Sequence, residues 1–229
     1  MAIKAILFDL DNTLFDISQI KKEAIQGAVQ SMLDAGLKMD KEEAVKKLSE
    51  EYFEKAKFYG RNILDEFLKK NKISDSRILA AGIHGYRKQK SKFMKPYPQV
   101  IETLEALKSR DLKLAIVSDA VSVKVHMNLY ALGINQYFDD VIPFEDSGKL
   151  KPSKEPFLLA LKRLGVKPEE TIHVGDYPER DVKGANDSGI ISVHAVYGNC
   201  RSKGPHEDKP NFEIHEFSEI LGVVQQLNK

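Results

Sequence analysis

Residues 5 to 13 read AILFDLDNT, and this stretch decides the fold class. Its first four residues are apolar, which is typical of a strand buried on both faces of a parallel sheet. Two acids, Asp9 and Asp11, follow at once. On an extended chain, residues i and i+2 project to the same side, about 7 Å apart. Buried strands do not usually end in two acids, so the pair indicates a functional site.

The rest of the chain repeats this apolar texture and alternates it with amphipathic segments. The further apolar runs cover residues 112–117, 171–174, 190–196 and 212–214. Helical spacing appears over residues 100–108, 121–132, 156–164, 182–188 and 219–227, the last of these with Ser218 as the expected cap. Strands that alternate with helices predict a doubly wound, mainly parallel α/β sheet of the Rossmann-like kind.

Residues 17–94 have a different character. The segment from about 18 to 93 is charged, helical in pattern and free of proline, and Pro96 and Pro98 then close it. Asp40, with Glu43 three residues later, resembles a helix-capping pair. At roughly 75 residues the insertion far exceeds an ordinary loop. We expect a small all-helical cap domain over 17–94, inserted into a core of residues 1–16 and 95–229. The alternative is four ordinary helices packed on the sheet.

Composition excludes several classes of protein. The chain has 229 residues, 42% of them hydrophobic, with a net charge of +1, so nothing global favours binding to nucleic acid or to an anionic membrane. No apolar stretch approaches the roughly 20 residues that span a bilayer, and no signal segment precedes the first strand, so a cytoplasmic protein is expected. The single cysteine, Cys200, and His206 lack zinc-site spacing. Oligomeric state is not readable.

Polar residues follow the other predicted strands as well. Ser118 comes directly after residues 112–117, and Asp176 follows 171–174, with Asp181 five residues later. Ligand sites of open α/β sheets lie at the carboxyl ends of the strands, so these side chains should meet at one edge. Clustered carboxylates repel one another unless a cation lies among them. Mg²⁺ prefers such oxygen ligands, and either Lys149 or Lys151 would also supply positive charge.

These residues resemble the four motifs of the haloacid dehalogenase-like hydrolase superfamily, in the family's order. Asp9 to Thr13 is similar to its D-x-D-x-T motif, Ser118 to its second motif and Lys151 to its third. Gly175-Asp176 through Asp181 is similar to its fourth motif, G-D-x-x-x-x-D. The helical insertion after the first motif resembles the family's C1-type cap, so the resemblance covers essentially the whole chain.

The resemblance implies roles in phosphoryl transfer. Asp9 would be the nucleophile that forms an aspartyl-phosphate, and Asp11 would protonate the leaving alcohol and later activate water. Ser118 and nearby backbone N–H groups would bind phosphate oxygens. Lys151 would offset the charge on Asp9 and on the phosphate. Thr13 would fix the turn and donate to the phosphate region.

The resemblance also implies a Mg²⁺ site. The side chain of Asp9, the backbone carbonyl of Asp11 and the side chain of Asp176 would be the ligands. Asp181 would steady a metal-bound water or Lys151; alternatively it caps the helix that follows it. Asp119 stands where the family often has asparagine, and we expect it only to cap the next helix. His173, inside an apolar strand, is expected to be a core residue.

Two acids narrow the choice within the superfamily. Haloacid dehalogenases lack counterparts of Asp11 and Asp176. The presence of these two acids therefore favours a Mg²⁺-dependent phosphatase over a 2-haloacid dehalogenase. A phosphomutase of the same family shares all four motifs and stays an alternative. A phospho-aspartate receiver domain is a further alternative from another class, but its aspartate follows the third strand and it lacks a cap. We expect a small phosphorylated metabolite as substrate, with Arg61 and Asn62 of the cap contacting its leaving group.

Overall fold

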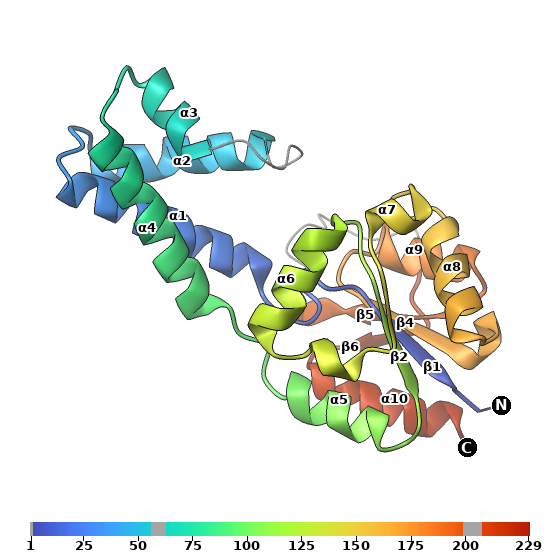
Figure 1. Ribbon diagram of the computed structural model, residues 1–229. Coiled ribbons are helices and arrows are strands. Elements are labelled where there is room, and N and C mark those ends of the chain that lie inside the picture. Colours follow the sequence, from blue (N-terminus) through green and yellow to red (C-terminus); the bar gives the residue numbers. More distant parts are fainter. Residues whose placement is uncertain (1, 56–62, 199–207) are drawn as a thin grey trace. The chain divides into compact units, whose positions relative to one another are not determined.

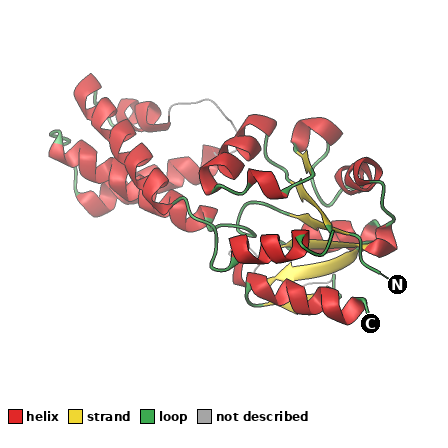
Figure 2. Cartoon of the chain, turned by 60° about the horizontal axis from the view of Figure 1, so that its bottom comes forward, coloured by secondary structure: helices red, strands yellow, loops and turns green. Residues whose placement is uncertain are grey.

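The computed structural model describes residues 2–55, 63–198 and 208–229. Contacts between residues divide the chain into two units. The core unit comprises Met1–Asp16 and Lys95–Lys229, and the helical unit comprises Ile17–Met94. Among the described residues, strands occur only in the core unit (Figure 2).

The core unit is built on a parallel sheet of six strands. In chain order these are β1 (Ala5–Phe8), β2 (Lys113–Val117), β3 (Asp140–Ile142), β4 (Thr171–Gly175), β5 (Ile191–Ala195) and β6 (Phe212–Ile214). They lie in the order β3-β2-β1-β4-β5-β6, and every neighbouring pair is parallel. The predicted doubly wound parallel sheet is confirmed, and β1 lies at its centre.

Helices cover both faces of this sheet. They are α5 (Val100–Lys108), α6 (Ser122–Leu132), α7 (Phe144–Ser147), α8 (Glu155–Leu164), α9 (Asp181–Asp187) and α10 (Ile220–Leu227), with short 3₁₀ turns η1 (Asn135–Tyr137), η2 (Pro168–Glu170), η3 (Val196–Gly198) and η4 (Phe217–Glu219). Helices α5 and α10 pack together on one face, and α8 and α9 lie on the other (Figure 1). Leu7 belongs to the apolar cluster with Phe157 of α8, while Phe8 contacts Phe217. Both faces are therefore apolar, which explains the continuous apolar runs.

One strand was missed in the sequence, and one helix cap was predicted wrongly. Strand β3 was not expected, because its three residues begin with Asp140 and stop before Pro143, which leaves too short an apolar run to detect. Ser218 does not cap the last helix. It lies inside the 3₁₀ turn η4, and Glu219 precedes α10 without a side-chain capping bond. The chain is already helical when it reaches Ser218, so this serine is not at the free end that a cap requires.

The helical unit has a hydrophobic core of its own. It consists of α1 (Ile17–Asp34), α2 (Lys41–Lys55), α3 (Ile63–Lys70) and α4 (Ser76–Phe93). Residues such as Met32, Leu48 and Phe67 form a buried apolar cluster within it. Asp40 accepts a hydrogen bond from the Glu43 N–H, and Asp75 caps α4. Over the described parts of the chain, no helix is long and apolar enough to cross a membrane.

Candidate active site

The sheet brings the predicted site residues to one edge. Asp9 follows β1, Ser118 follows β2 and Asp176 follows β4. Phe8, the last residue of β1, is in register with Val174 of β4, and the Asp9 N–H donates to the Val174 carbonyl at 2.9 Å. The strands are parallel and their ends are aligned, so these three residues emerge together at the carboxyl edge.

Lys151 lies at the centre of this cluster. Its Nζ donates to Asp9 Oδ1 at 2.6 Å, to Asp181 Oδ1 at 2.6 Å and to the Val117 carbonyl at 3.1 Å. The side chain of Lys151 is only 3% exposed. Lys149, the other lysine considered, is exposed. Of the two lysines, the structure brings Lys151 to the carboxylates.

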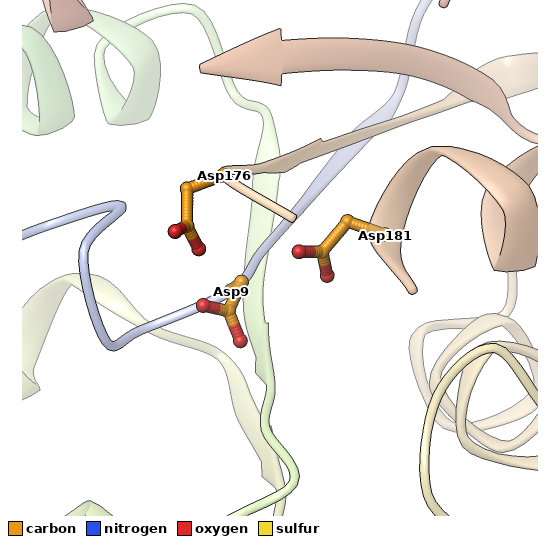
Figure 3. Close-up of side chains that lie close together, drawn as sticks. All are labelled: Asp9, Asp176 and Asp181. Carbon is orange, nitrogen blue, oxygen red and sulfur yellow. The ribbon is translucent and has the colours of Figure 1, made fainter. Parts of the chain in front are cut away.

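Three buried carboxylates converge at this edge of the sheet, and two of them, Asp9 and Asp181, contact Lys151. Asp9, Asp176 and Asp181 each offer an oxygen within 4.8 Å of the others (Figure 3). A Cβ on Gly175 would collide with the side chain of Asp181, so only glycine permits this close approach. When all are ionised, these carboxylates and the Lys151 ammonium carry a net charge of −2. A hard divalent cation such as Mg²⁺ fits both this charge and these oxygen donors.

The pKa values of these groups reflect burial and mutual interaction. Burial raises the pKa of Asp9 to about 7, although the neighbouring Lys151 acts to lower it. Burial also opposes the charge on Lys151, but Asp181 and Asp9 outweigh it and hold the pKa of Lys151 above its usual range. Burial would raise the pKa of Asp181, whereas Lys151 and His173 hold it below normal. The charged forms of Lys151 and Asp181 therefore stabilise each other, whereas burial disfavours the ionised form of Asp9.

His173 belongs to this network, although the sequence indicated only a core residue. It is buried on β4, its Nε2 lies 3.1 Å from Asp181 Oδ1, and its ring meets Phe157 edge-on. Burial lowers the pKa of His173, so the ring is neutral and Nε2–H is the donor to Asp181. Nδ1 has no hydrogen-bond partner among the described residues. The sequence signal was the histidine itself, in an otherwise apolar strand.

Asp119 and Arg180 form a second pair beside Lys151. Asp119 accepts the backbone N–H of Lys151 at 2.8 Å and the Arg180 guanidinium at 3.0 Å. Arg180 also lies over the ring of Tyr177, 5.0 Å from its centre. The expectation that Asp119 caps the next helix was wrong, since Val121 precedes α6 and the carboxylate of Glu145 accepts the N–H of Ser122, the first residue of the helix. Asp119 instead holds the loop that carries Lys151.

The alternative that Asp181 caps the following helix is also wrong, because Arg180 precedes α9 and no side-chain capping bond forms there. Asp181 is the first residue of α9, and its Oδ2 accepts the Tyr177 N–H at 3.0 Å. Its Oδ1 takes both Lys151 and His173. Both oxygens of Asp181 are thus engaged by protein donors.

The turn after β1 positions Asp11 and Thr13. Asn12 has a left-handed backbone (φ 66°), and a bridge joins Asp11 to Phe15. The Tyr197 hydroxyl donates to the Thr13 carbonyl at 2.8 Å. The Thr13 hydroxyl is buried and has no hydrogen-bond partner in the part of the chain that the structure describes. Gly198 packs so tightly on the Asn12 carbonyl that no Cβ would fit there.

A cavity of about 70 Å³ lies over these groups. Ser118 and Ala120 both line this cavity, and the Ser118 Oγ accepts the Ala120 N–H at 3.2 Å. The cavity wall thus includes the Ser118 hydroxyl and the backbone at Ala120. The lining residues are Asp9, Asp11, Asn12, Ser118, Asp119, Ala120, Lys151, Asp176, Tyr177, Arg180 and Asp181. The predicted contacts Arg61 and Asn62 lie outside the described residues.

Comparison with known proteins decides the family. The sequence model of the family described as haloacid dehalogenase-like hydrolase matches residues 6–195. This chain is a haloacid dehalogenase-like hydrolase. Two relatives of this hydrolase are named glyceraldehyde 3-phosphate phosphatase, one from Methanocaldococcus jannaschii and one from Methanopyrus kandleri. Each is 38% identical, and each alignment covers 99% of both chains.

A solved structure supports the same assignment. The haloacid dehalogenase-like phosphatase from Thermococcus onnurineus is 26% identical, with a TM-score of 0.67 over 97% of this chain and 98% of its own. The predicted family and the predicted class of enzyme, a phosphatase, are both confirmed. The receiver-domain alternative is excluded, because the family model matches residues 6–195, which include all four motifs and the helical insertion.

Proposed function

We propose that this hydrolase cleaves a small phosphorylated metabolite with Mg²⁺, through an aspartyl-phosphate on Asp9. One observation carries the proposal. The buried carboxylate of Asp9 lies at the end of the central strand, 2.6 Å from the Lys151 ammonium and next to Asp176 and Asp181. Such an arrangement places a nucleophile beside fixed positive charge and a candidate cation site, which phosphoryl transfer requires.

The relatives suggest the size of the substrate. Two of them are named for glyceraldehyde 3-phosphate, so a triose phosphate is the first compound to test. The helical unit would serve as the cap, with Arg61 and Asn62 as contacts to the leaving group. These two contacts and a cytoplasmic location remain predictions, as does the absence of nucleic acid and membrane partners.

In the first step, an oxygen of Asp9 attacks phosphorus and the ester P–O bond breaks. Asp11 gives its proton to the departing alcohol oxygen. Lys151 stabilises the negative charge that spreads over the phosphoryl oxygens. Ser118 and the backbone N–H groups beside it orient those oxygens from the cavity wall. Thr13, which the sequence also suggested as a phosphate contact, is fully buried and is not among the described residues that line the cavity, so its part is to fix the turn.

In the second step, Asp11 takes a proton from water. The water oxygen bonds to phosphorus, the bond to Asp9 breaks, and inorganic phosphate leaves with Asp9 regenerated. Asp181 keeps Lys151 aimed at Asp9 throughout, because both of its oxygens are held by protein donors.

Mg²⁺ would be held by the side chains of Asp9 and Asp176 and by the backbone carbonyl of Asp11. When bound, it supplies positive charge that neutralises the phosphoryl oxygens and favours the ionised form of Asp9. The net charge of −2 on the buried groups supports this choice. Asp181 is the poorer ligand, since Lys151, His173 and Tyr177 already occupy its oxygens.

The test is release of inorganic phosphate from glyceraldehyde 3-phosphate and from p-nitrophenyl phosphate, with Mg²⁺ and with EDTA. Wild type should release phosphate only with Mg²⁺, and Asp9→Asn should release none. Asp187→Asn, the same substitution at a half-exposed position of α9, is the control and should keep full activity. Trapping of ³²P on wild type, but not on Asp9→Asn, would report the aspartyl-phosphate.

Other outcomes would contradict the proposal. Activity that survives in Asp9→Asn would remove the nucleophile from the mechanism. Activity that survives in EDTA would remove the metal. Transfer of phosphate to an added sugar, without release to water, would indicate a phosphomutase. Chloride release from 2-chloropropionate would indicate a dehalogenase.

A further inference from the structure

Two side chains of helix α6, Lys124 and Asn128, contact the carboxylate of Asp11. Lys124 Nζ donates to Asp11 Oδ2 at 3.0 Å, and Asn128 Nδ2 lies 3.5 Å from Oδ1. Lys124 and Asn128 are four residues apart, so they lie on one face of the helix. One face of α6 thus contacts both carboxyl oxygens of Asp11, which is the general acid and base of the proposed function.

Burial separates the roles of these residues. Asn128 is buried, while the side chains of Lys124 and Asp11 are 21% and 23% exposed. Asp11 lines the cavity, whereas Lys124 and Asn128 are not among the described residues that line it. Lys124 and Asn128 are therefore placed to act on the chemistry through Asp11.

The backbone alone does not determine where the Asp11 carboxyl points. The bridge to Phe15 and the left-handed turn at Asn12 fix the main chain of Asp11. Two side-chain torsions remain, and a carboxyl that turns away from the leaving oxygen cannot deliver a proton to it. A cation on one oxygen and an amide on the other fix the plane of the carboxyl, and such preorganisation is what proton transfer requires.

We propose that Lys124, with Asn128, is the positioning residue that holds the Asp11 carboxyl towards the leaving group. This inference rests on the proposed function. The reaction itself is unchanged: Asp9 bonds to phosphorus, the ester P–O bond breaks, and the proton of Asp11 passes to the leaving oxygen. Lys124 contributes no atom to the reaction, and its substitution should harm only the step that needs this proton.

The experiment compares two leaving groups. Glycerol 3-phosphate releases an alkoxide that needs a proton, whereas p-nitrophenyl phosphate releases a stable phenolate. General acid catalysis contributes about 10²–10⁴-fold, so Lys124→Met should lower kcat/KM for glycerol 3-phosphate about tenfold or more. For p-nitrophenyl phosphate the loss should stay below about threefold, because the leaving group needs little of the acid's contribution. Asp11→Asn should show the same pattern with a larger difference.

Matched variants complete the design. Lys124→Arg, which keeps a cation, should restore much of the activity on glycerol 3-phosphate. The control is Lys108→Met, because Lys108 is another partly exposed lysine that pairs with an aspartate, Asp139. Asp139 accepts the N–H of Leu114, at the end of β2 opposite the candidate site. Lys108→Met should therefore change activity on neither substrate. In the Asp11→Asn background, adding Lys124→Met should cause no further loss, because the two residues act as one unit.

Three results would overturn the inference. Equal losses on both substrates would assign Lys124 a structural role. Unchanged activity on glycerol 3-phosphate would remove Lys124 from the reaction. An undiminished further loss in the Asp11→Asn background would show that Lys124 acts independently of Asp11. Failure of the proposed function looks different, since wild type itself would then release no phosphate from either substrate.

Discussion

The core unit and the helical unit bury different kinds of residue. In the core unit, Asp9, Lys151, Asp176 and Asp181 are all buried charged groups. In the helical unit, Glu51 is the one buried charged side chain among the described residues, and the rest of its core is apolar. Charge is therefore enclosed at the carboxyl edge of the sheet, whereas the helical unit is stabilised by apolar packing.

The two kinds of buried residue stabilise their units in different ways. A buried charge is costly unless partners surround it, so the network around Lys151 persists because each member compensates another. Apolar packing in the helical unit has no such requirement, and each of its side chains contributes through the surface that it removes from water. Substitutions in the charged network around Lys151 should thus impair catalysis, and substitutions in the apolar core of the helical unit should reduce stability.

The largest effect is expected at Lys151. Lys151→Met should lower kcat by about 10²–10³-fold, because it removes the fixed positive charge beside Asp9. Lys149→Met, the same change two residues earlier at an exposed position, should leave kcat within about twofold, as surface substitutions away from special features usually do. Steady-state phosphate release with saturating Mg²⁺ measures both, and circular dichroism checks that both variants fold. A greater loss in Lys149→Met would reverse the roles of the two lysines.

The helical unit should respond in stability. Leu48 is fully buried there, so Leu48→Ala should lower the free energy of unfolding by about 2–5 kcal/mol, from lost burial and the cavity left behind. The matched control is Leu158→Ala on α8, where the leucine is 48% exposed and the expected change is within about 0.5 kcal/mol. Urea denaturation followed by circular dichroism gives both values. Similar changes in the two variants would argue against a separate apolar core in the helical unit.

A smaller catalytic effect is expected at His173. Substitution of a residue that orients a direct contact of the substrate or metal typically lowers activity about 10–100-fold. His173→Leu should therefore lower kcat within this range. His173→Gln can place an amide N–H near the position of Nε2 and should recover part of the loss. Kinetics and thermal unfolding of both variants separate positioning from folding. If both variants keep wild-type kcat, Asp181 does not need His173 to aim Lys151.

Much of the fold could be predicted because its signals are local. The apolar run before Asp9 predicts β1, and helical spacing over residues 100–108 predicts α5 with the observed bounds. Strand β3 was missed because three residues next to a proline carry too little periodicity. The start of α10 was misplaced because a 3₁₀ turn runs into the helix and has no distinct residue signal.

The candidate site was predictable to the extent that its members follow strands. Asp9 and Ser118 come directly after apolar runs and Asp176 comes one residue after one, and parallel strands place such residues at one edge. His173, Arg180 and Lys124 were not found this way. A histidine inside a strand, an arginine in a loop and a lysine on a helix are each common without function.

The sequence by itself determined the alternation of strands and helices apart from β3, the helical insertion and the acids at the strand ends, because periodicity and motif spacing are properties of neighbouring residues. The motif resemblance already favoured Lys151 over Lys149, and the tertiary structure shows the contact of Lys151 with Asp9. Only the tertiary structure showed that Lys124 reaches Asp11. These pairs are 142 and 113 residues apart in the chain. Contacts over such separations depend on how the sheet and its helices pack together, and no local pattern encodes them.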